Sequence, residues 1–344
     1  MRGRVIGAVI AVVVIGGVFL FVLPQIADYG EVWDTITDLT WLQAVALAAA
    51  VVLNLATFAP PMMATLPGLG FPRALVVTQA STASTYVAPG GAAVGMGIAW
   101  AMLRAWHFAP GSVTLAVTLT GIWNQLFMLG APAVALALLT LAGGTNALLQ
   151  TVAFVGLAVF VVAVAAFAAA LTSSELARGL GDIAARLVNW AFQLVKRGPV
   201  TWNGRALVAF RHLAIGLLRR RWWTLTLATI VGQLAVFLVL IVCLRTLGVG
   251  ADQATLTEAF AAWALVRLLG SVPITPGGVG IVELGLTGAL VAFGGDNEGV
   301  VAAVLLYRVL TVLPTLALGL LAGMSWRRLR PSEAGETSER WRER

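Results

Sequence analysis

The hydrophobic pattern of this chain is a series of long apolar stretches separated by short polar segments. Each stretch comes close to or exceeds the ~20 residues that an α-helix needs to cross the hydrocarbon core of a bilayer. The stretches are residues 5–23, 41–59, 113–141, 147–171, 222–247 and 300–323. The alternating ten-residue segments typical of a membrane β-barrel are absent from the sequence. The pattern predicts an all-α polytopic membrane protein with about six full spans.

Two further apolar regions are interrupted. Residues 74–107 contain Pro89-Gly90-Gly91, and residues 258–293 contain Pro276-Gly277-Gly278. The halves of each region would form helices of roughly 21–24 Å, which is shorter than the hydrocarbon core of about 30 Å. Proline and glycine both favour a helix break, so we expect two re-entrant hairpins with the breaks buried near mid-membrane. Two complete short spans per region are the alternative. Both interpretations return the chain to the side of the membrane where the region began, so the orientation of the neighbouring spans does not distinguish them.

The distribution of Arg and Lys predicts the orientation of the spans, because positive charge is enriched in cytoplasmic loops. Arg2 and Arg4 place the N-terminus in the cytoplasm, and residues 5–23 then form an uncleaved anchor, with a signal peptide as the alternative. The basic segment 172–221 is expected in the cytoplasm, either as a simple connector or as an amphipathic helix that captures anionic lipid. We therefore expect a multi-pass protein of the cell (plasma) membrane with cytoplasmic N- and C-termini.

In this topology the two hairpins open to opposite sides of the membrane, which makes them members of inverted repeats. Interrupted segments at matching positions of inverted halves point to the substrate site of a transporter. The predicted divisions are an N-terminal span with an external segment (1–40), a first repeat (41–171), the basic segment (172–221), a second repeat (222–325) and a charged cytoplasmic tail (326–344).

Composition excludes several other classes of protein. Hydrophobic residues make up 60% of the chain and charged residues 11%, which excludes an ordinary soluble domain and a disordered chain. The net charge of +7 is explained by membrane orientation, so we expect no nucleic-acid partner. One cysteine, Cys243, and two histidines predict no disulfide, no metal site and no cofactor. Walker A, GxSxG and HExxH sequences are also missing, which disfavours a nucleotide-driven pump, a serine hydrolase and a metalloprotease.

Three ionisable residues of the second repeat fall inside apolar segments: Arg267, Glu283 and Arg308. Ionisable groups at membrane depth are costly and usually face each other or a wet cavity. We expect both arginines to bind an anion such as a lipid phosphate, helped by the N-termini of the second half-helices, while Glu283 balances their charge. The alternative is a structural Arg–Glu pair. The candidate binding residues are Arg267, Arg308, Glu283, Pro276, Gly277, Gly278, Gly280, Pro89, Gly90 and Gly91.

These same residues carry a resemblance to a known family. Val266-Arg267, the run from Pro273 to Glu283 and Tyr307-Arg308 resemble the hallmark of the lysylphosphatidylglycerol synthase transmembrane, or flippase-like, family, and the likeness extends over about residues 41–326. The resemblance implies a lipid flippase role and a function for Arg267, Glu283 and Arg308. Family members that carry a cytoplasmic aminoacyl-transferase domain make lysyl-phosphatidylglycerol and move it to the outer leaflet.

Two features depart from that pattern. The chain ends shortly after its last apolar stretch, so we expect no aminoacyl-transferase domain and no lysyl transfer. The first hairpin has Gly90, Gly91, Ala92 and Ala93 where many relatives carry charge, and Met96 stands where the second hairpin has Glu283. We therefore expect a lipid that differs from lysyl-phosphatidylglycerol.

The function predicted from the sequence is movement of an anionic or aminoacylated phospholipid, or a glycolipid, between bilayer leaflets. This is a transport role and not an enzymatic one, with membrane lipids as partners. One alternative is a non-transporting scaffold for a lipid-modifying or glycosyl-transferring enzyme. A membrane enzyme that acts on lipid phosphates is a second alternative, disfavoured by the scarcity of carboxylates and histidines in the apolar segments.

Overall fold

The computed structural model describes residues 39–87, 91–141, 147–176, 204–271 and 276–326, together with the isolated positions 179, 182 and 186. Within these ranges every regular element is helical, which confirms the predicted fold class. The elements are α3 (Trp41–Thr57), α4 (Ala59–Thr65), α5 (Phe71–Val87), α6 (Gly91–Ala105), α7 (Pro110–Leu141), α8 (Ala147–Thr172), α10 (Gly204–Thr246), α11 (Leu256–Gly270), the 3-10 turn η3 (Pro276–Gly278), α12 (Ile281–Ala292) and α13 (Asn297–Ser325).

Five helical segments of the described chain are long and apolar enough to cross a membrane. They cover residues 41–65, 110–141, 154–172, 210–246 and 297–325. Each overlaps one of the predicted full spans, whereas the predicted span at residues 5–23 lies outside the described residues. The helix α10 begins at Gly204, so it continues the membrane span into the basic segment that we expect in the cytoplasm.

Each interrupted region forms a pair of short helices, as the pattern predicted. The first pair, α5 and α6, has 17 and 15 residues, and the second pair, α11 and α12, has 15 and 12. Helices of these lengths measure about 18–26 Å, less than the hydrocarbon thickness. Residues 88–90 and 272–275, which connect the helices at the breaks, lie outside the described residues. Whether the pairs are re-entrant stays a prediction.

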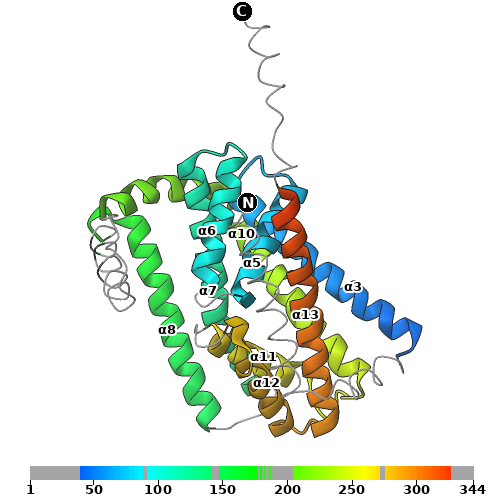
Figure 1. The fold of residues 1–344 in the computed structure, drawn as a ribbon. Coiled ribbons are helices and arrows are strands. Elements are labelled where there is room, and N and C mark those ends of the chain that lie inside the picture. The colour runs from blue at the N-terminus through cyan, green and yellow to red at the C-terminus, as the bar shows by residue number, and fades with distance from the viewer. Residues whose placement is uncertain are drawn as a thin grey trace, which may run out of the picture.

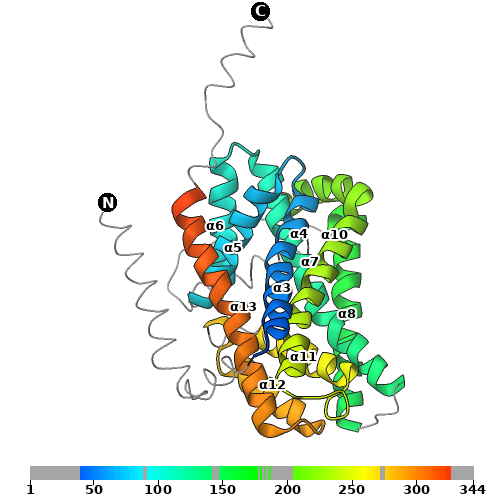
Figure 2. The ribbon, with the colours of Figure 1, turned by 90° about the vertical axis from the view of Figure 1, so that its right-hand side faces the viewer.

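The two pairs occupy opposite ends of the helical bundle (Figures 1 and 2). Helix α13 passes alongside both and packs against α5 and α12, while α3 and α8 flank the bundle on opposite sides. The pair α5–α6 packs closely because Gly91 and Gly95 face α5: an added Cβ would collide with Ser84 or Ser81 backbone oxygens. This placement fits the predicted inverted arrangement, and the repeat boundaries remain a prediction.

The bundle has separate apolar cores around its two pairs. One cluster surrounds the buried Trp263 of α11 and includes Leu240 of α10 and Val304 of α13. The other surrounds Leu103 of α6 and Val77 of α5. Each pair of short helices is therefore held in place by its own cluster of closely packed buried side chains.

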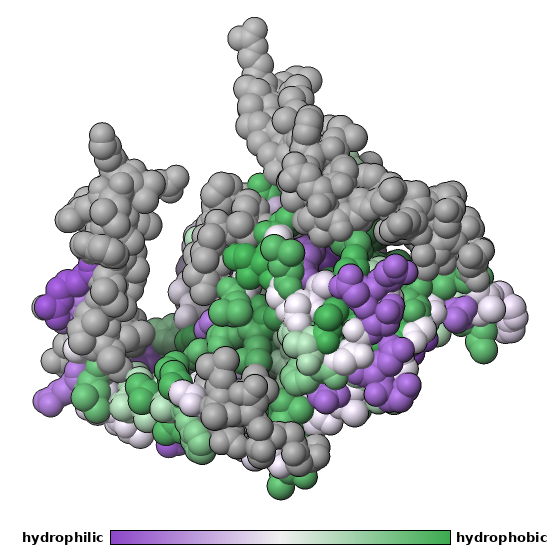
Figure 3. All heavy atoms as spheres, turned by 90° about the horizontal axis from the view of Figure 1, so that it is seen from below, coloured by the Kyte–Doolittle hydropathy of each residue, from purple (hydrophilic) through white to green (hydrophobic). Residues whose placement is uncertain are grey.

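The outer surface of the described bundle is strongly apolar along α8. Phe154 is 71% exposed and Val162 is 67% exposed. In water such a surface would be unfavourable, so it fits contact with acyl chains. Arg211 of α10 donates from Nε to Leu171 O (2.8 Å) and from Nη2 to Thr172 O (3.0 Å), which satisfies carbonyls at the C-terminus of α8. Seen from the α11–α12 end, hydrophilic residues form separate patches with hydrophobic residues between them (Figure 3).

Candidate functional site

A cavity of about 620 Å³ lies between the two short-helix pairs, with walls from α3, α4, α5, α6, α7, α10, α11, η3, α12 and α13. Its lining combines apolar surface with many polar side chains. Hydroxyl and amide groups dominate the polar lining, with Asn54, Thr57, Thr78, Ser81, Thr82, Thr85, Thr120, Asn124, Gln125, Thr229, Gln233, Ser271 and Thr311 among its residues. The charged residues of the lining are Arg267 and Arg308. A cavity of this size can hold a lipid headgroup.

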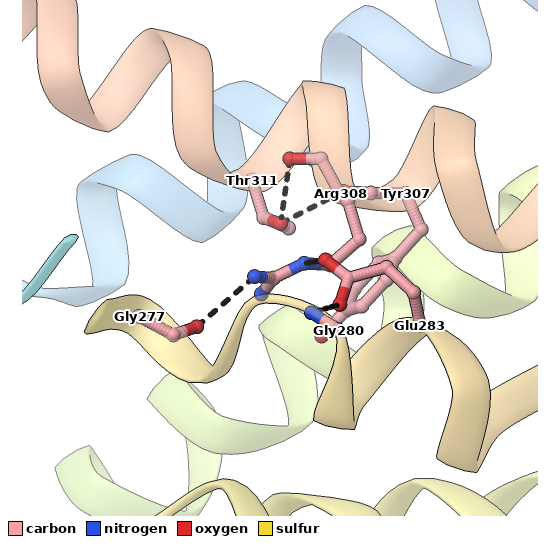
Figure 4. Close-up of polar contacts among 6 residues, drawn as sticks. All are labelled: Gly277, Gly280, Glu283, Tyr307, Arg308 and Thr311. Atoms are coloured by element: carbon pink, nitrogen blue, oxygen red, sulfur yellow. Dashed lines mark hydrogen bonds and ion pairs between the residues drawn. The ribbon is translucent and has the colours of Figure 1, made fainter. Parts of the chain in front are cut away.

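Arg308 is held by the second Pro-Gly-Gly segment (Figure 4). Its Nε donates to Glu283 Oε1 at 2.6 Å, and its Nη2 donates to Gly277 O at 3.0 Å. The pair is desolvated, since the side chains of Arg308 and Glu283 are 12% and 7% exposed. The Arg308 guanidinium therefore ties α13 to both the break and the first turn of α12.

Glu283 also completes the N-terminus of α12. Its Oε2 accepts the backbone N–H of Gly280 at 2.6 Å, three residues earlier in the chain. A carboxylate at this position is favoured because it satisfies a free N–H and interacts with the helix dipole. We expected this helix end to attract a substrate anion. In the structure Glu283 caps this helix end, and the charged groups that line the cavity are the two arginines. Binding of an anion at the N-terminus of α12 stays a prediction.

The glycines of the second break are required by the backbone. Gly277 has φ +62° and Gly280 has φ +84°, which are left-handed conformations that L-residues with a side chain adopt at a cost. At Gly277 an added Cβ would also collide with the ring of Tyr86 at the end of α5. The break of the second pair thus packs directly against the first pair.

Arg267 has a different environment from Arg308. Its Nη2 donates to Gln233 Oε1 at 2.7 Å, and Gln233 Nε2 donates to Asn124 Oδ1 at 2.5 Å. The guanidinium carbon lies 5.3 Å from the centroid of the Trp263 ring, within cation–π range. The buried Arg267 Nε has no hydrogen-bond partner within the described part of the chain. Arg267 is therefore held by neutral groups.

The cavity consequently carries an uncompensated positive charge. Two guanidiniums line it, and Glu283 neutralises one of them. Neither Asp nor Glu is among the described residues that line the cavity. A partly buried cation without a counterion is costly at membrane depth, so this arrangement favours entry of one negative charge from outside the protein.

The residues predicted from the sequence fall into four groups. Arg267, Arg308, Gly91, Gly277 and Gly278 line the cavity. Glu283 and Gly280 lie behind the lining and position Arg308. Pro276 begins η3. Pro89 and Gly90 lie outside the described residues.

Sequence reasoning missed Gln233 and the hydroxyl groups of α5, which make part of the cavity wall polar. Gln233, which holds Arg267, is a single amide in a long apolar stretch and gave no family or spacing signal. The hydroxyls of α5 recur at Thr78, Ser81, Thr82 and Thr85, which is the spacing of one helix face, and this pattern could have revealed a polar wall. Tyr86 follows directly, and only the fold shows its contact with Gly277.

These features define a polytopic helical membrane protein with an internal, positively charged, hydroxyl-lined cavity. The chain matches the model of the family described as "Lysylphosphatidylglycerol synthase TM region" over residues 8–319, and it belongs to that family. This confirms the resemblance read from the second hairpin. A search of curated proteins found no match to the chain.

Proposed function

We propose that the protein is a flippase-type lipid transporter that moves a phosphate-bearing lipid between leaflets of the cell membrane. The headgroup would pass through the cavity between the short-helix pairs, and the acyl chains would stay in the surrounding bilayer. The observation that carries this proposal is Arg267, a cation in the cavity wall whose partners are an amide and an aromatic ring.

The charge arrangement supports an anionic substrate. Insertion scales assign about 2.5–3.5 kcal/mol to an arginine at the centre of a membrane helix. A lipid phosphate next to Arg267 would offset that cost and could use the fork geometry of the guanidinium. Arg308 Nη2 and Nε are engaged by Gly277 and Glu283, which orients the remaining nitrogen as a second donor near the same cavity.

A transport role is favoured over catalysis by the state of Glu283. General acid–base chemistry needs a carboxylate that can exchange protons with the substrate. Glu283 is 6% exposed, accepts hydrogen bonds from Arg308 and Gly280, and is not part of the cavity wall. A cavity with donors and hydroxyls but without a free carboxylate suits binding and release of an unchanged lipid.

The test is a leaflet-exchange assay in vesicles that contain only this protein. The purified chain is reconstituted with acyl-labelled fluorescent phosphatidylglycerol, and dithionite quenching measures the lipid that reaches the outer leaflet. We expect lipid exchange to be faster in vesicles with the wild-type protein than in protein-free vesicles. In vesicles with Arg267→Gln the exchange rate should fall to that of protein-free vesicles. The matched control is Arg245→Gln, because Arg245 is also partly buried and donates to loop carbonyls, those of Val249 and Ala254.

The outcome also separates the alternative function. Exchange at the protein-free rate by a folded wild-type protein would contradict transport and support a scaffold for a lipid-modifying or glycosyl-transferring enzyme. Equal exchange in wild type and Arg267→Gln would support transport but would contradict a route of the headgroup through the cavity.

A further inference from the structure

Resting on the proposed function, we propose that the cavity selects a lipid whose phosphate carries one negative charge and whose headgroup is an uncharged polyol, such as a glycerol, inositol or sugar. Cationic aminoacylated headgroups are discriminated against. The assignment comes from the pairing of two features of the wall, a single uncompensated guanidinium and a face of hydroxyl oxygens on α5.

The hydroxyls of α5 form a continuous face along the cavity. Thr78, Ser81, Thr82 and Thr85 all line it and span about 10 Å of helix. The end at Thr85 lies beside the second break, because the next residue, Tyr86, packs against Gly277, whose carbonyl binds Arg308. A phosphate at the arginines would therefore leave its headgroup beside this face.

These hydroxyls are presented chiefly as acceptors. Thr78 donates to Ala74 O at 2.8 Å, Ser81 to Thr78 O at 3.0 Å and Thr85 to Thr82 O at 2.7 Å. A hydroxyl that donates to its own helix keeps its oxygen lone pairs free. Such a wall satisfies O–H groups of a ligand and offers little to a second phosphate.

Asn54 is a buried amide beside the same cavity. This residue is 1% exposed, and its Oδ1 has no hydrogen-bond partner within the described residues. Because this oxygen is fully buried, a headgroup would meet the α5 hydroxyls and not Asn54. Headgroup O–H donors thus match the α5 face.

An ammonium group would also donate to these oxygens, but its charge does not match the cavity. The lining residues include no carboxylate, and Arg267 already supplies a net positive charge. A lysyl headgroup would bring further positive charge next to Arg267 without a counterion, which costs free energy at low dielectric. The cavity therefore favours neutral polyols over aminoacyl headgroups.

Binding of defined lipids to the purified full chain tests this selectivity separately from transport. Native mass spectrometry would compare phosphatidylinositol, phosphatidylmethanol (the same charge without hydroxyls) and lysyl-phosphatidylglycerol at equal concentration. We expect phosphatidylinositol to bind about ten-fold more tightly than phosphatidylmethanol, and lysyl-phosphatidylglycerol to bind the least. Preference for the lysyl lipid, or equal binding of the two anionic lipids, would overturn the proposal. Displacement of phosphatidylinositol by equimolar glycerophosphoinositol would show a soluble phosphate ester to be the ligand and would also overturn it.

A variant locates the selectivity on α5. Thr82→Val with Thr85→Val should remove most of the advantage of phosphatidylinositol over phosphatidylmethanol and leave the affinity for phosphatidylmethanol unchanged. Thr140→Val is the matched control, because Thr140 also donates to its own helix but lies outside the cavity lining. An equal loss for both lipids, or an unchanged ratio in a folded variant, would contradict the assignment. Selective binding without leaflet exchange would refute the transport function alone.

Discussion

Arg267 Nη2 lies 2.7 Å from Gln233 Oε1, so this intramembrane cation is positioned by a neutral amide. Asn124 fixes the other end of the same amide, which links α7, α10 and α11 in one polar chain. Arg308, in contrast, has Glu283 as a counterion at 2.6 Å. The two arginines therefore have separate roles: Arg308 organises the second break, and Arg267 supplies the charge that the cavity offers to a ligand.

Loss of the Glu283 charge should destabilise the fold. In Glu283→Gln the partly buried Arg308 loses its counterion, and the cost expected from broken buried pairs is about 3 kcal/mol. Thermal unfolding in detergent would measure the effect. The double variant Glu283→Gln, Arg308→Gln should be more stable than the sum of the single changes predicts, because it leaves no unpaired charge. Additive losses would show that the pair is energetically uncoupled.

Gly277 should tolerate no side chain while Tyr86 is present. Gly277→Ala introduces both a left-handed alanine and a collision with the Tyr86 ring. The backbone part costs about 1–2 kcal/mol, and the collision adds to it. Tyr86→Ala in the same chain should recover the collision part only. A double-mutant cycle by thermal unfolding measures this recovery, and no recovery would contradict direct packing of the break on α5.

The re-entrant interpretation predicts that both breaks are shielded from each side of the membrane. Single cysteines at Thr85 and Ser271, in a Cys243→Ala background, flank the breaks and line the cavity. We expect poor reaction with bulky impermeant thiol reagents from either side. Asp252→Cys, in an exposed loop predicted to be external, is the reactive control. Labelling of Thr85→Cys from outside as rapid as that of the control would indicate two full spans.

The helical segments were predictable because their signal is local. Long apolar runs leave the backbone few options other than helix in a bilayer, and all five predicted spans that fall in described residues coincide with long apolar helices. The Pro-Gly-Gly breaks were predictable for a similar reason, since Gly277 and Gly280 need conformations that other residues avoid. A structural Arg–Glu pair was the alternative that the cost of isolated charge in the membrane suggested, and Arg308 and Glu283 form such a pair.

The remaining site residues depend on packing between segments distant in sequence. Gln233 contacts Arg267 because α10 and α11 meet, and periodicity within one helix carries no such information. The capping role of Glu283 could have been predicted, because its position three residues after Gly280 is the capping-box spacing. Binding of a substrate anion at this helix end stays a prediction.

Gln233→Glu tests the central claim most directly. It places a carboxylate of nearly the same shape beside Arg267, so it neutralises the cavity without removing the arginine, and rotation of the Asn124 amide can preserve the neighbouring hydrogen bond. Leaflet exchange of phosphatidylglycerol and thermal unfolding would be measured on the same preparation. The account predicts exchange reduced at least ten-fold, as expected when a charge-assisted contact is lost, with stability equal to or above that of wild type. Exchange at the wild-type rate in a folded Gln233→Glu protein would contradict the assignment of Arg267 as the phosphate-binding charge.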